Sequence, residues 1–339
     1  MAIKIGTIEV TGVAVGETLV DSVAVGSNVV WQRVLPDPLC FTGTSTDSVR
    51  MTKVGSPDSA NIEYSKDGSN WTAYTFGTWI DFDGTGNKVY FRAASDNNTS
   101  FYTDASNYYR FELDENSPTT VSGNIDTLLN KKGTRHITKS RAYRELFSGM
   151  SGLTDASQLE FPSDTMTLQC YYGTFQNCTS LSSAPVLPAT SLGASCYRLM
   201  FQGCSSLTTA PELPATTLAA NCYQGMFQGC SSLTTAPELP ATTLSQSCYT
   251  NMFRECTSLA TAPELPATTL AVNCYQYMFY GCTRLSSITV GFSDWQAANT
   301  PTTSWVYGVA ASGEFYCPSE LSVVYGASNI PTGWTKSNI

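Results

Sequence analysis

The chain has 339 residues, 42% of them hydrophobic and only 13% charged, and its net charge is −9 with a single histidine. This acidic balance argues against nucleic-acid binding, because proteins that bind nucleic acids carry a basic surface. No apolar run is long enough to cross a bilayer, so the sequence predicts no membrane insertion.

Residues 1–34 contain a short repeat. The motif Val-x-Val-Gly, or its isoleucine variant, recurs every ten residues from Ile3, Val13 and Val23, and Trp31 closes the series. Alternating β-branched residues punctuated by glycine predict short hairpin strands. Such strands make too small a core to stand alone, so we expect them to need a partner surface. An edge hairpin of the following domain is the alternative interpretation.

This opening resembles that of many tailed-phage fibre proteins, in which the corresponding region attaches the appendage to the virion. The resemblance implies docking to other virion proteins, of the capsid or the tail, through Ile5, Val13, Val15, Val23, Val25 and Trp31. The start of the chain lacks a basic segment followed by an apolar run, so no secretory signal is expected.

Residues 35–115 are predicted to form an immunoglobulin-like β-sandwich, preceded by a stiff proline-containing segment at 35–38. Hairpins are expected at 61–74 and 78–93, because aromatic and β-branched residues alternate around glycine-containing turns. Asp81 and Asp83 precede Gly84 as in a calcium loop, but no glutamate follows at the required position, which favours a plain turn.

Residues 116–141 are predicted to connect the two halves, with a helical turn at 125–129 that covers the end of the following region. Six of the basic residues then fall within 14 positions: Lys131, Lys132, Arg135, Lys139, Arg141 and Arg144. A nucleic-acid patch and a seam against an acidic neighbour are the two interpretations, and the overall charge favours the seam.

From Cys170 the sequence repeats five times with a period of 26 residues, and a looser copy begins at Ala142. A fixed period of this length predicts stacked supersecondary units, since one unit cannot bury its apolar face alone. We therefore expect a mainly β chain in which residues 142–291 form a solenoid, and the spacing of the leucines within each copy resembles that of leucine-rich repeats. In each copy, Cys-Tyr-x-x-Met-Phe has helical spacing and predicts a short helical or 3₁₀ segment. A short strand is expected at 207–213 in the second copy, limited by two prolines.

The motif Met-Phe-x-Gly-Cys-x-Ser-Leu, followed by Ala-Pro-Glu-Leu-Pro-Ala-Thr-Thr-Leu, resembles BspA-like leucine-rich repeats. These repeats occur in surface proteins of gut anaerobes and in their phages. The resemblance covers 142 to about 291 and implies a binding scaffold rather than a catalyst. It points to a virion appendage, a head or tail fibre, of tailed phages of gut Bacteroidales-type bacteria.

Positions that differ between otherwise similar copies are expected to face solvent. A row of glutamine, arginine and tyrosine along the repeats suits contact with a host glycan or protein, and unselected surface is the alternative. The candidates for receptor contact within the repeats are Arg198, Gln202, Gln224, Gln228, Arg254, Gln276, Tyr277 and Tyr280.

Ten of the twelve cysteines fall in two columns of the repeat. We expect them to be reduced core thiols, with disulfides and a metal as the alternatives. Glu212, Glu238 and Glu264 form a row of like charges, which is mildly destabilising unless a cation binds there. No further carboxylates accompany them at calcium-loop spacing, so the sequence predicts neither a metal site nor a cofactor.

Residues 292–339 are rich in aromatic side chains and are predicted to form a C-terminal cap, because the open end of a solenoid has to be covered. Their ending also resembles the close of BspA-like proteins. Exposed aromatic side chains at a tip can stack on sugars, and Trp305 is the candidate for that role. A purely structural cap is the alternative.

No catalytic arrangement is recognisable: the chain has neither a nucleophile elbow nor a phosphate-binding loop, so no enzymatic activity is predicted. The two resemblances together imply a head-fibre, tail-fibre or decoration subunit of the virion, assembled in the host cytoplasm. A bacterial cell-surface leucine-rich-repeat adhesin is the alternative. Fibre subunits commonly form trimers, so the resemblance allows a homotrimer, and the oligomeric state stays open.

Overall fold

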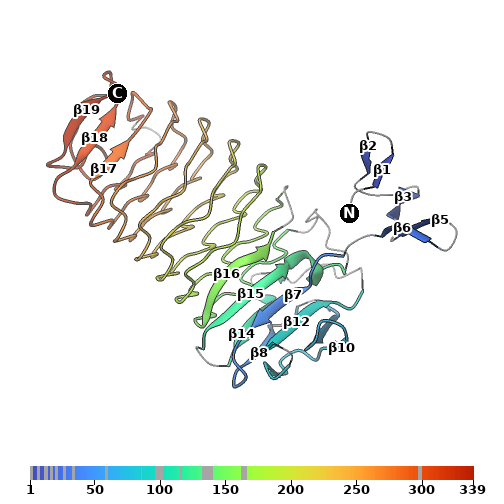
Figure 1. Ribbon diagram of the computed structural model, residues 1–339. Helices are drawn as coiled ribbons and strands as arrows, with labels where there is room; N and C mark the ends of the chain where they lie inside the picture. The colour runs from blue at the N-terminus through green and yellow to red at the C-terminus, as the bar shows by residue number, and fades with distance from the viewer. Residues whose placement is uncertain are drawn as a thin grey trace. The chain divides into compact units, whose positions relative to one another are not determined.

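The computed structural model describes residues 3–5, 8–10, 14–15, 18–19, 22–25, 28–32, 35–57, 60–84, 86–95, 102–104, 106–114, 117–131, 140–161, 166–296 and 300–339. Side chains are described from residue 35 onward, except at 102–104. This part of the chain is mainly β, with one short 3₁₀ helix and several open sheets (Figure 1). No helix within it has the length and apolar character to cross a membrane. The chain divides into two compact units, Met1–Asp37 and Pro38–Ile339.

The first unit contains three separate antiparallel hairpins. They are β1 (Ile3–Ile5) with β2 (Ile8–Val10), β3 (Ala14–Val15) with β4 (Thr18–Leu19), and β5 (Ser22–Val25) with β6 (Asn28–Gln32). Each copy of the ten-residue repeat therefore supplies one hairpin, which confirms the prediction of short hairpin strands. The valine motif accounts for the first strand of each hairpin, and the second strand follows each glycine.

The second unit begins with two sheets, of strand order β10-β9-β12-β7-β15-β16 and β11-β8-β14-β13. Adjacent strands run antiparallel, except for the parallel pair β15 and β16. The elements are β7 (Leu39–Thr42), β8 (Ser48–Val54), β9 (Ile62–Ser65), β10 (Thr72–Ala73), β11 (Ile80–Asp81), β12 (Lys88–Ala93), β13 (Tyr102–Asp104), β14 (Asn107–Leu113), β15 (Thr119–Asn124), the 3₁₀ helix η1 (Ile125–Leu128) and β16 (Leu153–Glu160).

Phenylalanine side chains form the core between the two sheets. Phe41 of β7 and Phe91 of β12 have ring centroids 4.8 and 5.0 Å from that of Phe111 in β14. Phe147, in the first repeat-like turn, stacks on Phe111 at 5.8 Å. Strand β15 lies in the segment expected to be a connector and pairs with both β7 and β16. The core of the sheets is therefore continuous with the repeat region.

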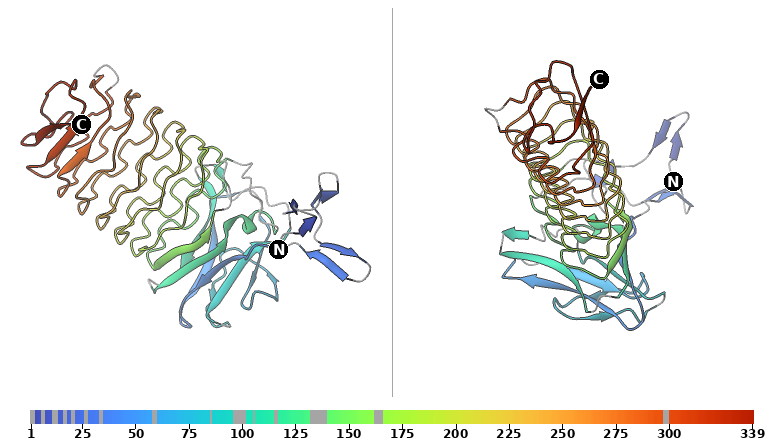
Figure 2. Two further views of the ribbon diagram at one scale, coloured as in Figure 1. Left: turned by 45° about the horizontal axis from the view of Figure 1, so that its top comes forward. Right: turned by 90° about the vertical axis from the view of Figure 1, so that its left-hand side faces the viewer.

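The Cys-Tyr-x-x-Met-Phe segments are not the helical or 3₁₀ segments that their spacing predicts. They are successive β-turns, in which alternate N–H groups bond three residues back, as Met200 N does to Tyr197 O at 3.2 Å. The intervening N–H groups bond to the next turn, as Tyr197 N does to Cys222 O at 3.0 Å. Every fourth residue, including Ser195 and Leu199, has a positive φ, which a right-handed helix does not allow. Figures 1 and 2 show successive turns following the same path between β16 and β17.

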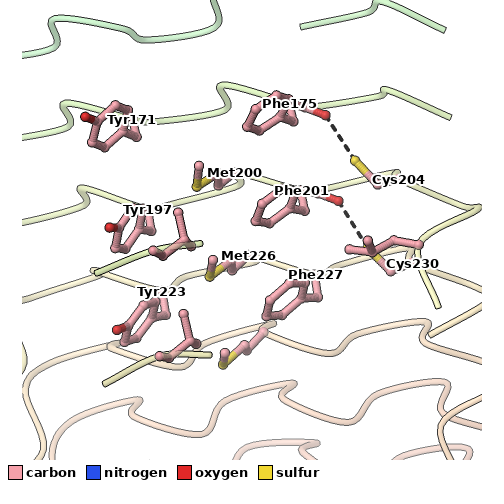
Figure 3. Close-up of a cluster of buried hydrophobic side chains, with 14 of the residues drawn as sticks. Tyr171, Phe175, Tyr197, Met200, Phe201, Cys204, Tyr223, Met226, Phe227 and Cys230 are labelled. Atoms are coloured by element: carbon pink, nitrogen blue, oxygen red, sulfur yellow. Dashed lines mark hydrogen bonds between the residues drawn. The ribbon is translucent and has the colours of Figure 1, made fainter. Parts of the chain in front are cut away.

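Two columns of aromatic rings run through these turns (Figure 3). Neighbouring rings are nearly parallel, and their centroids lie 5.5–6.0 Å apart in the tyrosine column and 5.3–5.8 Å apart in the phenylalanine column. The columns are Tyr143, Tyr171, Tyr197, Tyr223, Tyr249 and Tyr275, and Phe147, Phe175, Phe201, Phe227, Phe253 and Phe279. Offset parallel stacking of this kind adds to the free energy of burial.

The strand expected at 207–213 is reduced to single β-bridges between neighbouring turns. They include Thr209 with Thr235 and, at the equivalent place two copies later, Thr261 with Ser287. Pro211 and its repeats have no N–H, so a continuous ladder cannot form along this side. Among the described turns, the β-turn segment therefore supplies most of the backbone bonds between copies.

The path of the repeat continues past Gly291, where the sequence repeat fades. Phe279 N donates to Trp305 O at 2.8 Å, in the same manner as in the earlier turns. Strands β17 (Ser287–Thr289), β18 (Glu314–Cys317) and β19 (Thr335–Asn338) pair in parallel. The indole nitrogens of Trp295, Trp305 and Trp334 each donate to a backbone carbonyl. The C-terminal region thus forms a further, irregular turn with a buried aromatic core.

The first and the third member of the tyrosine column, Tyr143 and Tyr197, give a matched prediction about hydroxyl groups. The Tyr143 hydroxyl donates to buried Asp126 Oδ1 at 2.8 Å, whereas the buried Tyr197 hydroxyl has no partner among the described atoms. Tyr143→Phe should lower the free energy of unfolding by about 1.5–3 kcal/mol, because a carboxylate loses a donor. Tyr197→Phe should change it by less than about 0.5 kcal/mol or raise it. Urea unfolding of both variants measures the difference, and equal effects would contradict this assignment.

Candidate functional site

Two rows of side chains with one member per turn run along the β-turn side. The arginine row consists of Arg144, Tyr172, Arg198, Gln224, Thr250 and Gln276. The amide row consists of Gln176, Gln202, Gln228, Arg254, Tyr280 and Tyr307. Each member except Tyr307 directly follows a buried ring of the tyrosine or phenylalanine column, and Tyr307 follows the buried Val306, so a core side chain precedes every member. These rows contain most of the residues that the sequence predicts for receptor contact.

Members of the arginine row lie against one another rather than extending freely into solvent. The Tyr172 ring has the Arg144 guanidinium 4.2 Å and the Arg198 guanidinium 5.6 Å from its centroid. Arg198 Nε and Gln224 Oε1 are buried without a hydrogen-bond partner in the described part of the chain. Arg198, Gln224 and Gln276 are half-buried. The expectation that these variable residues face solvent is therefore met only in part.

The amide row changes its chemistry along the stack. Near its start, the Gln176 amide donates to Gln202 Oε1. Farther on, the Arg254 guanidinium lies 4.8 Å from the centroid of Tyr280, and Tyr280 stacks on Tyr307 with centroids 4.9 Å apart. Tyr277 meets the Tyr280 ring edge-on at 6.1 Å. The structure thus brings Arg254, Tyr277 and Tyr280 together, with Tyr307 added.

The third variable row lies at positions that have a left-handed backbone conformation. Leu199, Gly225, Asn251 and Tyr277 all have φ between 54° and 62°. Glycine and asparagine tolerate this left-handed region, whereas bulky side chains in it are strained. Glycine, asparagine and serine that recur every fourth residue are the signal in the sequence that could have identified these positions, but the helical spacing of the apolar residues obscured it.

Trp305 does not belong to a contact surface. Its side chain is 0% exposed, and its indole nitrogen donates to Asn329 O at 2.9 Å. It occupies the place that Met278 has one turn earlier, because the Trp305 carbonyl accepts from Phe279 N. The proposed role of Trp305 in stacking on a sugar is therefore wrong, and the ring is part of the core of the last turn.

The candidate attachment residues lie in the three N-terminal hairpins. Ile5 ends β1, Val15 ends β3, and Val23 and Val25 lie in β5. Trp31 lies in β6, where it pairs with Val23. Val13 lies outside the described residues. The described candidates therefore lie on three separate two-stranded sheets rather than on one sheet, and only Val23 and Trp31 pair with each other.

The glutamate row lies on another side of the repeats. Glu212, Glu238 and Glu264 are exposed, and the last two line a hollow of about 610 Å³ between two Ala-Pro-Glu-Leu-Pro segments. Within the described residues, no three His, Cys, Asp or Glu side chains cluster as metal ligands. Asp83, in the loop that resembles a calcium loop, pairs with Lys66, and this hydrogen bond lowers the pKa of the carboxyl group.

The described members of the basic segment pair within the protein. Lys131 pairs with Glu63 at 3.1 Å, Arg144 pairs with Glu145 at 3.0 Å, and Arg141 Nε donates to Gln169 at 2.7 Å. These contacts favour the interpretation as a seam between segments of the chain. Lys132, Arg135 and Lys139 lie outside the described residues.

All twelve cysteines are buried and free of disulfides, as the repeat pattern predicts for the ten that lie in its two columns. Thiols of the second column donate to the phenylalanine carbonyl of the preceding turn: Cys178 to Phe147, Cys204 to Phe175, Cys230 to Phe201, Cys256 to Phe227 and Cys282 to Phe253. Burial raises the pKa of the thiols of Cys178, Cys230 and Cys282 to about 12. The thiol rather than the nucleophilic thiolate is therefore the form present at neutral pH.

Comparison of the chain with models of protein families, with curated proteins and with solved structures finds no match. The functional interpretation therefore depends on the geometry of the rows and on the resemblance of the repeat sequence. The rows combine cationic, amide and aromatic groups, which together suit noncovalent binding.

Buried thiols predict a loss of stability in alkali. Their folded pKa of about 12 lies above the unfolded value of 9.0. Their contribution is therefore complete below about pH 9 and is lost as the pH rises toward 12. Each such thiol should lower the free energy of unfolding by about 1.4 kcal/mol per pH unit in that window.

Urea unfolding at intervals from pH 7 to pH 10.5 tests this sign. We expect an almost constant free energy of unfolding up to about pH 8.5 and a steep decrease above it. Replacing Cys178 and Cys230 by serine should make the decrease less steep. An unchanged free energy between pH 7 and pH 10.5 would show that the thiols titrate alike in both states.

Proposed function

We propose that this chain is a non-enzymatic structural and adhesive protein of a tailed-phage particle, a head-fibre, tail-fibre or decoration subunit. In this proposal, residues 1–34 dock onto other virion proteins. An immunoglobulin-like sandwich follows, and a BspA-like leucine-rich-repeat solenoid over 142–291 presents a surface to a host glycan or protein. The protein needs no cofactor, binds no nucleic acid and does not insert into a membrane.

The observation that carries this proposal is that, within each repeat, the shared residues form the core and the differing residues lie between them in rows. The residues shared by the copies, such as Tyr197, Phe201 and Cys204, are buried in the columns of the core. Residues that differ, such as Arg198 and Gln202, lie in rows along the outside. A stack of this kind presents adaptable side chains on a fixed backbone, which is the usual use of repeat proteins in binding.

Two further observations support the individual parts. Met1–Asp37 is a separate compact unit of small hairpins, and such hairpins need a partner surface for stability. The cysteine thiols of the chain are buried, and burial raises the pKa values of Cys178 and Cys230, which favours a structural use of these thiols over a catalytic one.

Removal of the first unit tests the docking step. The full chain and a variant lacking residues 1–37 would be added to purified particles from a phage deleted for this gene, followed by density-gradient sedimentation. We expect the full chain to sediment with the particles and the shortened chain to stay at the top of the gradient. Circular dichroism and thermal unfolding of the shortened chain serve as the folding control. Equal sedimentation of both proteins would disprove docking through residues 1–37.

A further inference from the structure

The last two turns carry an aromatic cluster that the earlier turns do not have at the same positions. In the amide row, glutamine occupies three successive turns, at 176, 202 and 228, after Ser148 in the first repeat-like turn, and tyrosine occupies the last two, at 280 and 307. Tyr280 lies between the Arg254 guanidinium, 4.8 Å from its centroid, and the Tyr307 ring, 4.9 Å away. We call Tyr277, Tyr280 and Tyr307 the tyrosine platform.

Packing of the repeat does not require this platform. Glutamine fills the same place in three turns without loss of the backbone pattern, and Tyr307 is 55% exposed. Tyr277 has a φ of 54° at a position where Gly173 and Gly225 occur. A bulky side chain in the left-handed region costs free energy, and such outliers concentrate at binding sites. Tyr277 therefore carries backbone strain, as Leu199 does at the same position, and the Tyr280 and Tyr307 rings are not required by the backbone pattern.

A hollow of about 220 Å³ lies directly beside the platform. Tyr307, Gly308, Gly326, Ala327, Pro331 and Thr332 are among the residues that line it. Tyr280 covers one side of Tyr307, and the hollow adjoins the same residue. A rigid ring next to a small hollow, with backbone and hydroxyl groups in the wall, suits a ligand that has both an apolar face and hydroxyl groups.

We propose that Tyr307, its stacking partner Tyr280 and the adjoining hollow bind one neutral hexopyranose unit of a glycan. A C–H face of the sugar lies on the Tyr307 ring, and its hydroxyl groups meet polar groups of the hollow. This inference rests on the proposed adhesive function and names the ligand class and the place of contact. It replaces Trp305 with Tyr307 as the aromatic contact at the C-terminal end of the chain.

Charge and size favour a neutral sugar over other ligands. The residues that line the hollow are uncharged, and Arg254 pairs with Glu255 at 3.2 Å, so this pair adds no net charge. An anionic or cationic ligand would therefore find no complementary charge there. A stable protein interface covers about 800 Å² on each partner. One half-exposed tyrosine and a hollow of about 220 Å³ offer much less, but they fit a single ring.

Binding of simple sugars by the full chain tests the proposal. The probes are the methyl glycosides of glucose, galactose, mannose and N-acetylglucosamine, observed by saturation-transfer difference NMR with titration. We expect at least one of them to bind. Tyr307→Gln, which restores the residue of the earlier turns, should raise its Kd at least roughly fivefold, since an aromatic contact is lost. Tyr172→Gln is the matched control, because the Tyr172 ring also lies against arginine but belongs to an early turn, far from the hollow in sequence. The Kd of this variant for the sugar should equal that of the unaltered chain.

Three results would overturn the sugar subsite. The first is no binding of any probe by the full chain, and the second is equal binding by the full chain and Tyr307→Gln. The third is photocrosslinking of a host-cell protein through benzoylphenylalanine at position 307, which would assign the platform to a protein partner. Thermal unfolding of Tyr307→Gln should match that of the unaltered chain, which separates lost binding from lost structure. Particle association through residues 1–37 is measured independently, so a failed sugar test leaves the virion role in place.

Discussion

Backbone hydrogen bonds between successive turns are the constraint on which the repeat region depends. Alternate N–H groups of each β-turn segment bond within the turn and the others bond to the next turn, as Leu199 N does to Gln224 O at 2.9 Å. This alternation requires positive φ at every fourth residue and directs Tyr197, Phe201 and their equivalents inward. The ring columns stack because the bonds hold neighbouring turns in register, and one period of 26 residues satisfies the bonds and the stacking together.

The same alternation determines which surface the protein can present. Residues between the buried rings, such as Arg198 and Gln202, form rows with one member per turn, so changes in single copies alter the chemistry at one level of the stack. The change from glutamine to tyrosine at 280 and 307 produces the platform without any change in the backbone path. Adhesive specificity can therefore vary along the chain while the core stays the same.

Much of the core was predictable from the repeat, because a residue shared by every copy is one that stacking constrains. The buried cysteines and the place of Phe147 followed in this way, and the separate ten-residue repeat predicted the N-terminal hairpins. The turn conformation did not, since apolar spacing suits a helix equally well and reveals no N–H direction. The pairing of β15 with β16 was not predictable, because it depends on contacts between segments far apart in the sequence. The burial of Trp305 was not predictable either, because the register of the turns continues after the sequence motif has faded. The platform was missed in part because Tyr307 lies beyond the recognisable repeat.

The most direct test of the account is the location of the chain in an infected culture. Quantitative mass spectrometry would compare density-purified phage particles with washed outer membranes of the host cells. The account predicts that the chain is recovered with the particles, at a fixed ratio to the major capsid protein in successive gradient fractions. Recovery with the outer membranes, and its absence from purified particles, would contradict a virion role and indicate a bacterial surface adhesin.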